Sequence, residues 1–178
     1  MAYSSVFKDN LAQSKTVMGG TIQGYYAFSN YVNCTFTKNM AKATATNSFG
    51  GVIYYELGNL TVSSCRFNMN EANSANVSIG AGIYAHANTT IYHCDFMKNK
   101  VSGKNIGGGA IANLANMTVT KTNFIDNNAT NAGNAITAVS GSSTTIEDNY
   151  WNSNNPQWKK LLIGVNAPKS YSKTKITH

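Results

Sequence analysis

Charged side chains are scarce in this chain. Only 12% of its 178 residues are Asp, Glu, Lys or Arg, whereas an ordinary soluble domain contains about 25%. The basic residues are 13 lysines and one arginine, and the lysines are scattered except near the C-terminus. Proteins that bind nucleic acids usually cluster lysine and arginine on one face. We therefore expect no nucleic-acid partner, although the net charge is +7.

Long apolar runs, prolines and a leader-like start are also missing. No apolar run approaches the roughly 20 residues that a membrane-spanning helix needs, so we expect no integral membrane segment. Two prolines are too few for a proline-rich linker. Residues 1–10 lack the charged start and apolar stretch of a secretory signal. We therefore expect either a piece of a longer exported protein or a chain that is not exported.

Asparagine takes the place of the missing charge, with 25 residues. Hydrophobic residues make up 42% of the chain, which excludes a disordered protein because such chains lack the apolar surface to fold. A single domain of this length buries roughly 70% of its unfolded surface. The composition thus predicts a folded chain.

Internal repeats of about thirty residues dominate the sequence. A phenylalanine recurs at intervals of 28 to 31 residues, and an asparagine follows each phenylalanine by three positions. A cysteine stands two positions before three of these phenylalanines. The phenylalanines are Phe7, Phe36, Phe67, Phe96 and Phe124, the asparagines are Asn10, Asn39, Asn70, Asn99 and Asn127, and the cysteines are Cys34, Cys65 and Cys94.

Two further motifs keep the same period. The first is a glycine-rich turn that leads into an isoleucine, as in Gly50-Gly51-Val52-Ile53, and the second is a short β-branched segment such as Leu60-Thr61-Val62. The recurring isoleucines are Ile22, Ile53, Ile83, Ile111 and Ile136, and the equivalents of Val62 are Ile91, Val119 and Ile146. Each copy therefore holds three short β-type segments separated by turns, and none has the length or period of a helix.

Segments of three to five residues are too short to enclose a hydrophobic core alone. They can enclose one together if each copy is one coil of a solenoid, stacked about 4.8 Å from the next. We predict an all-β fold, a right-handed parallel β-helix of five to six coils of 28–31 residues with three short strands per coil. The right hand follows from the strong preference of parallel crossovers. We assign residues 1–165 to this solenoid, with a C-terminal cap from about residue 149, and residues 166–178 to a tail or a linker to a missing downstream module.

In this arrangement equivalent residues lie over one another inside the coil. We expect an aromatic ladder, an aliphatic ladder and a column of reduced, buried thiols, since a free cysteine packs as a small hydrophobe. We expect corners at Ser63-Ser64 and at the repeated asparagines, since asparagine tolerates left-handed backbone and its amide can bond to the next coil. The core positions are Phe36, Phe67, Phe96, Phe124, Ile53, Ile83, Ile111, Cys34, Cys65 and Cys94, and the corner asparagines are Asn39, Asn70, Asn99 and Asn127.

The pairing of glycine–isoleucine and Phe-x-x-Asn motifs resembles the repeat of the polymorphic outer membrane proteins, over roughly residues 5–150. The closing stretch 149–165, with Trp151 and Trp158, looks like the end of β-helix domains in adhesin-like surface proteins of methanogenic archaea. The resemblance implies an exported chain of several domains, located at the cell surface or outside the cell.

Enzymes built on parallel β-helices need two or three acids that converge on one outer face. The seven acids of this chain are scattered, and only Glu147 and Asp148 are neighbours. We expect Arg66 and Asp95 to form an exposed ion pair on adjacent coils. Cysteines at short spacing, as in a zinc site, are absent from the sequence. We therefore predict no catalytic residues, no cofactor and no metal.

Two other features remain as candidate sites. Of the Asn-x-Ser/Thr sequences, we consider Asn76 and Asn128 the best candidates for glycosylation. Variable, polar segments at residues 11–18, 40–49, 71–79, 100–107 and 128–132 separate the corner asparagines from the glycine motifs. We expect these segments to be loops along one edge of the solenoid, where binding commonly resides.

These observations favour a non-enzymatic, adhesin-like module at the cell surface, a rigid scaffold whose loops contact cells, glycans or matrix. A glycan or a surface protein of another cell would be the partner, and the open ends of the solenoid are expected to be able to self-associate. Two alternatives stay open. One is a polysaccharide lyase or hydrolase, and the other is a purely structural spacer.

Overall fold

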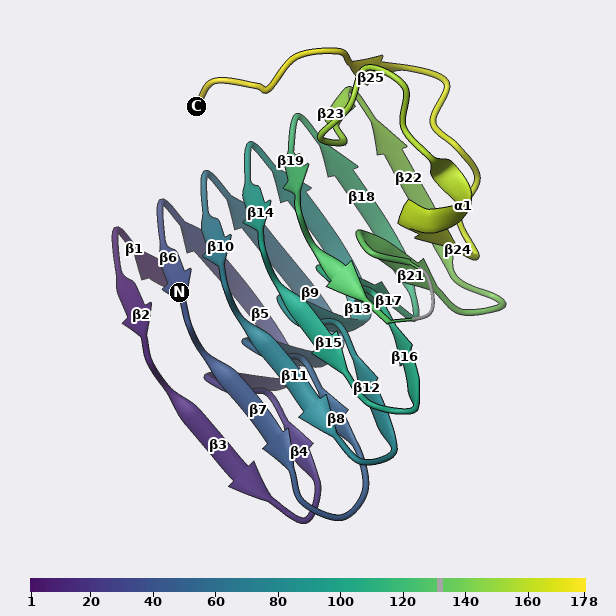
Figure 1. Cartoon of the computed structure of the whole chain (residues 1–178). Helices are drawn as coiled ribbons and strands as arrows, with labels where there is room; N and C mark the ends of the chain where they lie inside the picture. The colour runs from purple at the N-terminus through teal and green to yellow at the C-terminus, as the bar shows by residue number, and fades with distance from the viewer. Residues whose placement is uncertain (131–132) are drawn as a thin grey trace.

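Parallel strands make up nearly all of the regular secondary structure in the computed structural model, which describes residues 1–130 and 133–178. Successive turns of the chain stack along one axis as a β-solenoid (Figure 1). After β1 (Ala2–Tyr3) of sheet A, a complete turn passes through four sheets in the order B, C, D and A. Sheet C has five strands among the described residues, one from each of the first five turns. The prediction of an all-β parallel β-helix is confirmed.

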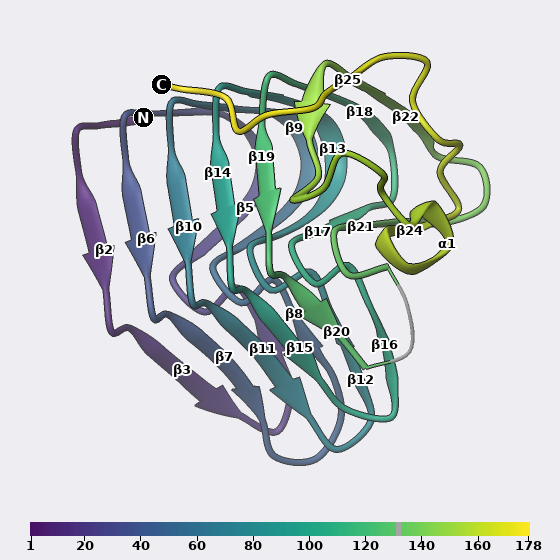
Figure 2. The same cartoon turned by 45° about the horizontal axis from the view of Figure 1, so that its top comes forward.

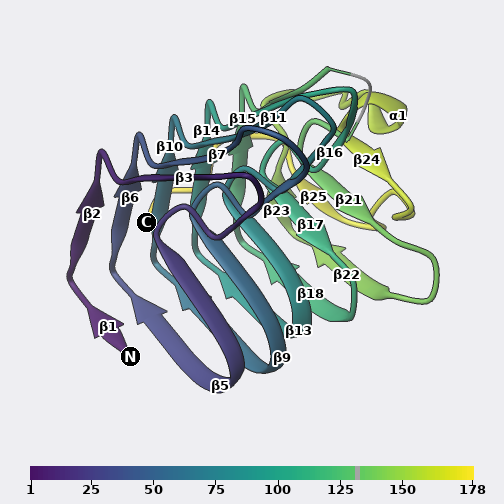
Figure 3. The same ribbon diagram turned by 90° about the horizontal axis from the view of Figure 1, so that it is seen from below.

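Sheet A contains the longest strands, which follow one another along the solenoid (Figure 3). Its nine strands are β1 (Ala2–Tyr3), β5 (Ile22–Val32), β9 (Ile53–Ser63), β13 (Ile83–Tyr92), β17 (Ile111–Asn113), β18 (Asn116–Thr120), β21 (Ile136–Ala138), β22 (Ser143–Glu147) and β24 (Leu162–Ile163).

Sheet B carries the phenylalanines, and most of its strands form a row in Figure 2. Its seven strands are β2 (Val6–Lys8), β6 (Thr35–Thr37), β10 (Arg66–Asn68), β14 (Asp95–Met97), β19 (Asn123–Ile125), β23 (Asn149–Tyr150) and β25 (Tyr171–Ser172).

Sheets C and D are formed by the segments that we expected to be loops, and this prediction is wrong. Sheet C consists of β3 (Leu11–Ser14), β7 (Met40–Ala43), β11 (Glu71–Ser74), β15 (Lys100–Ser102) and β20 (Asn128–Ala129), and sheet D of β4 (Val17–Met18), β8 (Ser48–Phe49), β12 (Val77–Ile79) and β16 (Asn105–Gly107). Small side chains point inward here, and Ala41, Ala72 and Val101 are fully buried. Because the backbone of one coil pairs with that of the next, even polar segments form strands. Residues 131–132 of the last predicted loop lie outside the described residues.

The number of strands per coil also differs from the prediction. The glycine–isoleucine segment and the β-branched segment form one continuous strand in β5, β9 and β13. They separate only in the later coils, as β17 and β18 and as β21 and β22. In β13 an irregularity between His86 and Asn88 marks the junction.

The aromatic ladder is as predicted. The rings of Phe36, Phe67 and Phe96 stack at 4.6 Å between neighbouring centroids, and all three side chains are fully buried. Phe124 continues the stack at 5.5 Å. Stacked aromatic pairs contribute about 0.5–1.5 kcal/mol each beyond the area they bury.

The aliphatic ladder is confirmed as well. Ile22, Ile53, Ile83, Ile111 and Ile136 pair in register from coil to coil. Tyr31, Val62, Ile91, Val119 and Ile146 form the parallel column.

Left-handed residues mark both of the corners that the sequence predicted. Ser64 lies in this region with φ of 52°, as predicted for the Ser63-Ser64 corner. At the asparagine corner the left-handed residue is the one before the asparagine, for example Lys38 and Met69. The expectation that asparagine itself adopts this backbone is therefore wrong, and the asparagine is kept for its side-chain hydrogen bonds.

The C-terminal coil leaves the regular path after Trp151. Its ring stacks on Phe124 at 4.7 Å, and Trp158, at the start of the short helix α1 (Trp158–Leu161), packs edge-on against it. The chain then joins sheet A through β24 and sheet B through β25. Sheets C and D receive no strand from this coil within the described residues, so β20 is an edge of sheet C.

Residues 166–178, expected to be a tail or linker, pack on the solenoid instead. Tyr171–Ser172 forms β25, and the following residues run back toward β10 and β14 in Figure 1. The backbone N–H of Ile176 donates to the Asn123 side chain at 2.9 Å.

Candidate functional site

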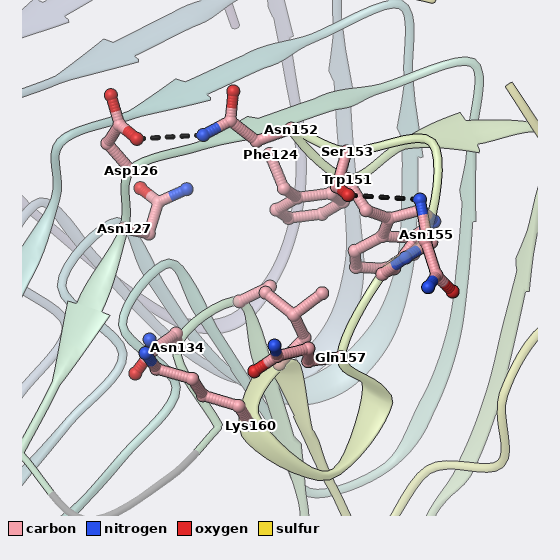
Figure 4. A pocket seen from close by; sticks show the side chains of 13 residues that line it. Phe124, Asp126, Asn127, Asn134, Trp151, Asn152, Ser153, Asn155, Gln157 and Lys160 are labelled. Carbon is pink, nitrogen blue, oxygen red and sulfur yellow. Dashed lines mark hydrogen bonds between the residues drawn. The ribbon is translucent and has the colours of Figure 1, made fainter. Parts of the chain in front are cut away.

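A pocket lies at the C-terminal end of the solenoid, where the last coil leaves sheet C (Figure 4). Its volume is about 380 Å³, which is within the range of small-molecule sites. The pocket is lined by Phe124, Asp126, Asn127, Asn134, Ala135, Trp151, Asn152, Ser153, Asn155, Pro156, Gln157, Lys160 and Leu161.

The apolar part of the lining is the end of the aromatic stack. Phe124 and Trp151 are 2% and 1% exposed, so their rings are part of the core rather than free platforms. The indole N–H of Trp151 is buried and finds no hydrogen-bond acceptor among the described residues. Such unpaired buried polar atoms are rare in folded proteins and call for an explanation.

The polar part of the lining consists mainly of side-chain amides. The Asn152 amide donates to Asp126 Oδ1 at 2.8 Å, and Asn134 Oδ1 accepts from the backbone N–H of Ala129 at 3.1 Å. Asp126 and Lys160 bring one negative and one positive charge. The lining is therefore close to neutral overall and rich in hydrogen-bonding groups.

Asn127 links the pocket to the asparagine corner of the solenoid. In each earlier coil the asparagine carboxamide oxygen accepts two bonds from the preceding asparagine; Asn70 Oδ1, for example, accepts from Asn39 N at 2.9 Å and from Asn39 Nδ2 at 3.0 Å. Asn127 is the last member of this ladder and is 8% exposed. The predicted corner asparagines Asn39, Asn70, Asn99 and Asn127 thus form one continuous hydrogen-bonded column.

The cysteines directly follow the left-handed residue of the other predicted corner, as Cys65 follows Ser64. All three are free and buried. Cys65 Sγ accepts from the backbone N–H of Cys34 at 3.3 Å and donates to the Ser63 carbonyl at 3.2 Å. Thr122 and Asn149 provide the equivalent oxygen in the later coils. These contacts give the thiols a structural role, and burial raises the pKa of Cys34 and of Cys94.

The Arg66–Asp95 pair is not the exposed pair that the sequence predicted. Arg66 Nε lies 3.5 Å from Asp95 Oδ2, but the Asp95 side chain is only 6% exposed. Asn123 donates to Asp95 Oδ1 at 2.7 Å, and His178 Nε2 lies 3.4 Å from the same oxygen. The segment that ends at His178 covers Asp95. Because this segment is far from Asp95 in the sequence, the repeat pattern could not predict that the aspartate side chain is buried.

The remaining acids bind local partners in separate parts of the surface. Glu56 accepts from the Tyr54 hydroxyl at 2.6 Å, which raises the tyrosine pKa after the larger effect of burial. Glu147 accepts from the backbone N–H and the hydroxyl of Ser170, which lower its pKa. Across residues 1–130 and 133–178, no group of three or more His, Cys, Asp or Glu side chains is placed to hold a metal ion.

Both candidate glycosylation sites are exposed. Asn76 lies on the turn between β11 and β12, and its amide is 3.3 Å from Asn47 Oδ1. Asn128 begins β20 at the edge of sheet C. Nothing in these positions blocks access to either side chain, so glycosylation there stays a prediction.

The sequence alone did not reveal the pocket. The available signal was the end of a regular repeat: Phe-x-x-Asn recurs up to Asn127, and the next aromatic at that position, Trp151, leads into Pro156 and a helix. In the part of the chain that the structure describes, no helix is long and apolar enough to span a bilayer. Comparison with protein-family models, with curated proteins and with solved structures finds no match to this chain.

Proposed function

We propose that the chain is a non-enzymatic, adhesin-like module that works at the cell surface and contacts glycans. The observation that carries this proposal is the pocket at the end of the solenoid, whose polar lining is mostly amides, with one hydroxyl and the opposite charges of Asp126 and Lys160, beside a buried aromatic pair. Such a lining suits the recognition of a polar, uncharged molecule. The resemblance of the repeat to polymorphic outer membrane proteins and to archaeal adhesin-like proteins supports the same role by analogy.

The rigidity of the scaffold also supports binding. The pocket is built on a ladder of stacked rings and on an asparagine column that runs from coil to coil as far as Asn127. Sites held by packed, hydrogen-bonded elements are preorganised and lose little entropy when a ligand binds.

The polysaccharide lyase or hydrolase alternative receives less support. Such enzymes position two acids about 5 to 10 Å apart around the bond they break. Among the described residues, Asp126 is the only carboxylate that lines the pocket, and one of its oxygens accepts a hydrogen bond from Asn152.

The test is binding to a glycan array and to cells by beads coated with the folded chain, with heat-unfolded chain on matched beads as the control. We expect saturable binding by the folded chain only, and no release of new sugar ends from neutral or acidic polysaccharides. Release of such ends would contradict the proposal in favour of an enzyme. Equal behaviour of folded and unfolded beads would contradict it in favour of a spacer.

A further inference from the structure

The asparagine column repeats one hydrogen-bonding unit in every coil. The backbone N–H and the side-chain amide of one asparagine both donate to the carboxamide oxygen of the asparagine in the next coil. For the pair Asn70 and Asn99 the two distances are 3.0 and 2.9 Å, and for Asn99 and Asn127 they are 3.1 and 2.9 Å. Each unit is thus a two-donor site that is filled by one amide oxygen.

Asn127 offers the same two donors, but no asparagine of a following coil supplies an oxygen to them within the described residues. The Asn127 amide donates to the carbonyl of Phe96 in the preceding coil at 2.8 Å, as the Asn99 amide does to the carbonyl of Phe67. Its second amide hydrogen and its backbone N–H meet no acceptor among residues 1–130 and 133–178. Figure 4 shows the Asn127 amide nitrogen on the side of Phe124 and Trp151, facing the pocket. Because the side chain is more than nine-tenths buried, leaving these donors unpaired is unfavourable.

We propose that this pocket binds an N-acetylated amino sugar, whose acetamido carbonyl oxygen takes the place of the absent asparagine oxygen. The acetamido group is a carboxamide, the same group that fills the site in every earlier coil. This inference rests on the proposed glycan-binding function and names the sugar class that the pocket selects.

The rest of the lining fits the rest of such a sugar. Ser153, Asn155 and Gln157 stand around the pocket as partners for ring hydroxyls. The buried indole N–H of Trp151 is a further donor without a partner in the described chain. Asp126 and Lys160 balance each other's charge, which favours a neutral ligand over an acidic one.

A carboxamide is also present in asparagine and glutamine side chains of peptides. The sugar is favoured because polar side chains surround the pocket on several sides, and a ring of hydroxyls can use them together. A single peptide side chain would leave most of these groups without a partner. Peptide binding is therefore an outcome of the test and not the proposal.

The experiment is an NMR titration of the folded chain with N-acetylglucosamine and N-acetylgalactosamine, and with glucose and galactose as controls. We expect saturable shifts of the Asn127 side-chain and backbone amide signals with one or both N-acetyl sugars. The sugars without the acetamido group should bind at least about ten-fold more weakly, which corresponds to about 1.4 kcal/mol of binding free energy.

Two exposed neighbours provide matched variants. Asn155→Trp places a large ring in the lining and should abolish the shifts, whereas Asn154→Trp, next to the pocket but outside its lining, should keep them. Equal binding by both variants, or absence of shifts with both N-acetyl sugars, would overturn the proposal. Shifts with the tripeptide Gly-Asn-Gly but not with the sugars would assign the pocket to a peptide amide and overturn it as well. If the titration fails while folded beads still bind glycans, only this inference is lost and the proposed function stands.

Discussion

Asn70 shows how one buried side chain can join several coils. Its oxygen accepts two hydrogen bonds from Asn39, and its amide donates to the Phe36 carbonyl and to Asn99 Oδ1, all between 2.9 and 3.0 Å. The side chain is fully buried, and its oxygen and amide group are all paired. An aliphatic side chain of similar size would leave the Asn39 donors and the Phe36 acceptor unpaired inside the protein.

We expect Asn70→Ala to destabilise the fold by about 3 kcal/mol or more, because several buried partners lose their hydrogen bonds. Asn73→Ala is the matched control, since Asn73 is half-buried and its side-chain amide donates to the nearby Glu71; it should change stability by about 0.5 kcal/mol or less. Urea unfolding of both variants gives the comparison. Similar losses in the two variants would contradict the structural role of the asparagine column.

The raised pKa of Cys94 predicts a decline of stability at alkaline pH. Burial disfavours the thiolate in the folded state, whereas the thiol of the unfolded chain titrates at about 8.5. The contribution of this thiol is thus fully present below pH 8.5 or so and is lost as the pH rises, by up to about 1.4 kcal/mol per pH unit.

Cys94→Thr should flatten this decline between about pH 8.5 and 9.5, below the usual range of tyrosine, because a hydroxyl does not ionise there. The equivalent residue of the next coil, Thr122, already fills the position with a threonine. Unfolding free energies at several pH values provide the measurement. Identical pH profiles for the variant and the parent chain would show that Cys94 does not carry the effect.

The sequence predicted these side chains well where a repeat was present. The thiols and the corner asparagines occupy their expected columns, because identical residues at a constant interval must lie over one another in a solenoid. The exposure of Asp95 was misjudged because His178, about eighty residues later in the chain and outside any repeat, lies against its carboxylate.

In the glycine turns before sheet A, the turn lies close to the backbone of the strand that follows it. Gly80 has φ of +69°, and a Cβ atom there would stand 2.4 Å from the Ile83 carbonyl oxygen. Gly141 has a similar φ of +88° but no atom within 4 Å of the same position. The two glycines therefore separate the cost of the backbone conformation from the cost of crowding.

Gly141→Ala should destabilise by about 1 kcal/mol, the cost of a left-handed backbone. Gly80→Ala should cost at least about 2 kcal/mol, since the clash with the Ile83 backbone adds to this strain. Thermal unfolding measured in parallel compares them. A Gly80→Ala variant as stable as Gly141→Ala would mean that the turn relaxes without loss.

Sheets C and D show the limit of prediction from sequence patterns. The strands of sheet C contain alanine, serine, asparagine and lysine, which are not among the residues enriched in strands, and they vary from coil to coil. The structure forms them because neighbouring coils hold their backbones one strand spacing apart, whatever the side chains. A pattern of β-branched residues marks strands that are stabilised by side-chain packing. The strands of sheets C and D are instead stabilised by backbone pairing with the neighbouring coils, which leaves no such pattern in the sequence.

The C-terminal segment binds the outer face of sheet B through Asn123. This fully buried asparagine donates to Asp95 and to the Ile176 carbonyl, and it accepts from the Ile176 N–H. The segment therefore depends on one residue for several of its contacts with the solenoid.

Asn123→Ala should release residues 173–178 while leaving the coils folded. We expect faster hydrogen exchange at the Ile176 amide and little change in the amides of the asparagine column. Asn128→Ala, also in the fifth coil but exposed, is the control. Unchanged exchange at Ile176 would show that other contacts hold the segment.

The position of the pocket follows from the solenoid as a body. A solenoid can add coils as long as each coil offers the next one a matching set of ladders. Here the aromatic ladder ends on Trp151 and the asparagine ladder on Asn127, so the two columns stop at different heights. The repeats predicted the ladders, but the step between their ends depends on the path of residues 152–161, where no repeat is left to follow.

The stacked interior is the central claim, and urea unfolding of Phe67→Ala beside Asn68→Ala tests it most directly. Phe67 is fully buried between two other rings, whereas its neighbour in β10, Asn68, is half-buried on the outer side. We predict a loss of about 3–5 kcal/mol for Phe67→Ala and a change of about 0.5 kcal/mol or less for Asn68→Ala. Equal, small changes in both variants would contradict the stacked core.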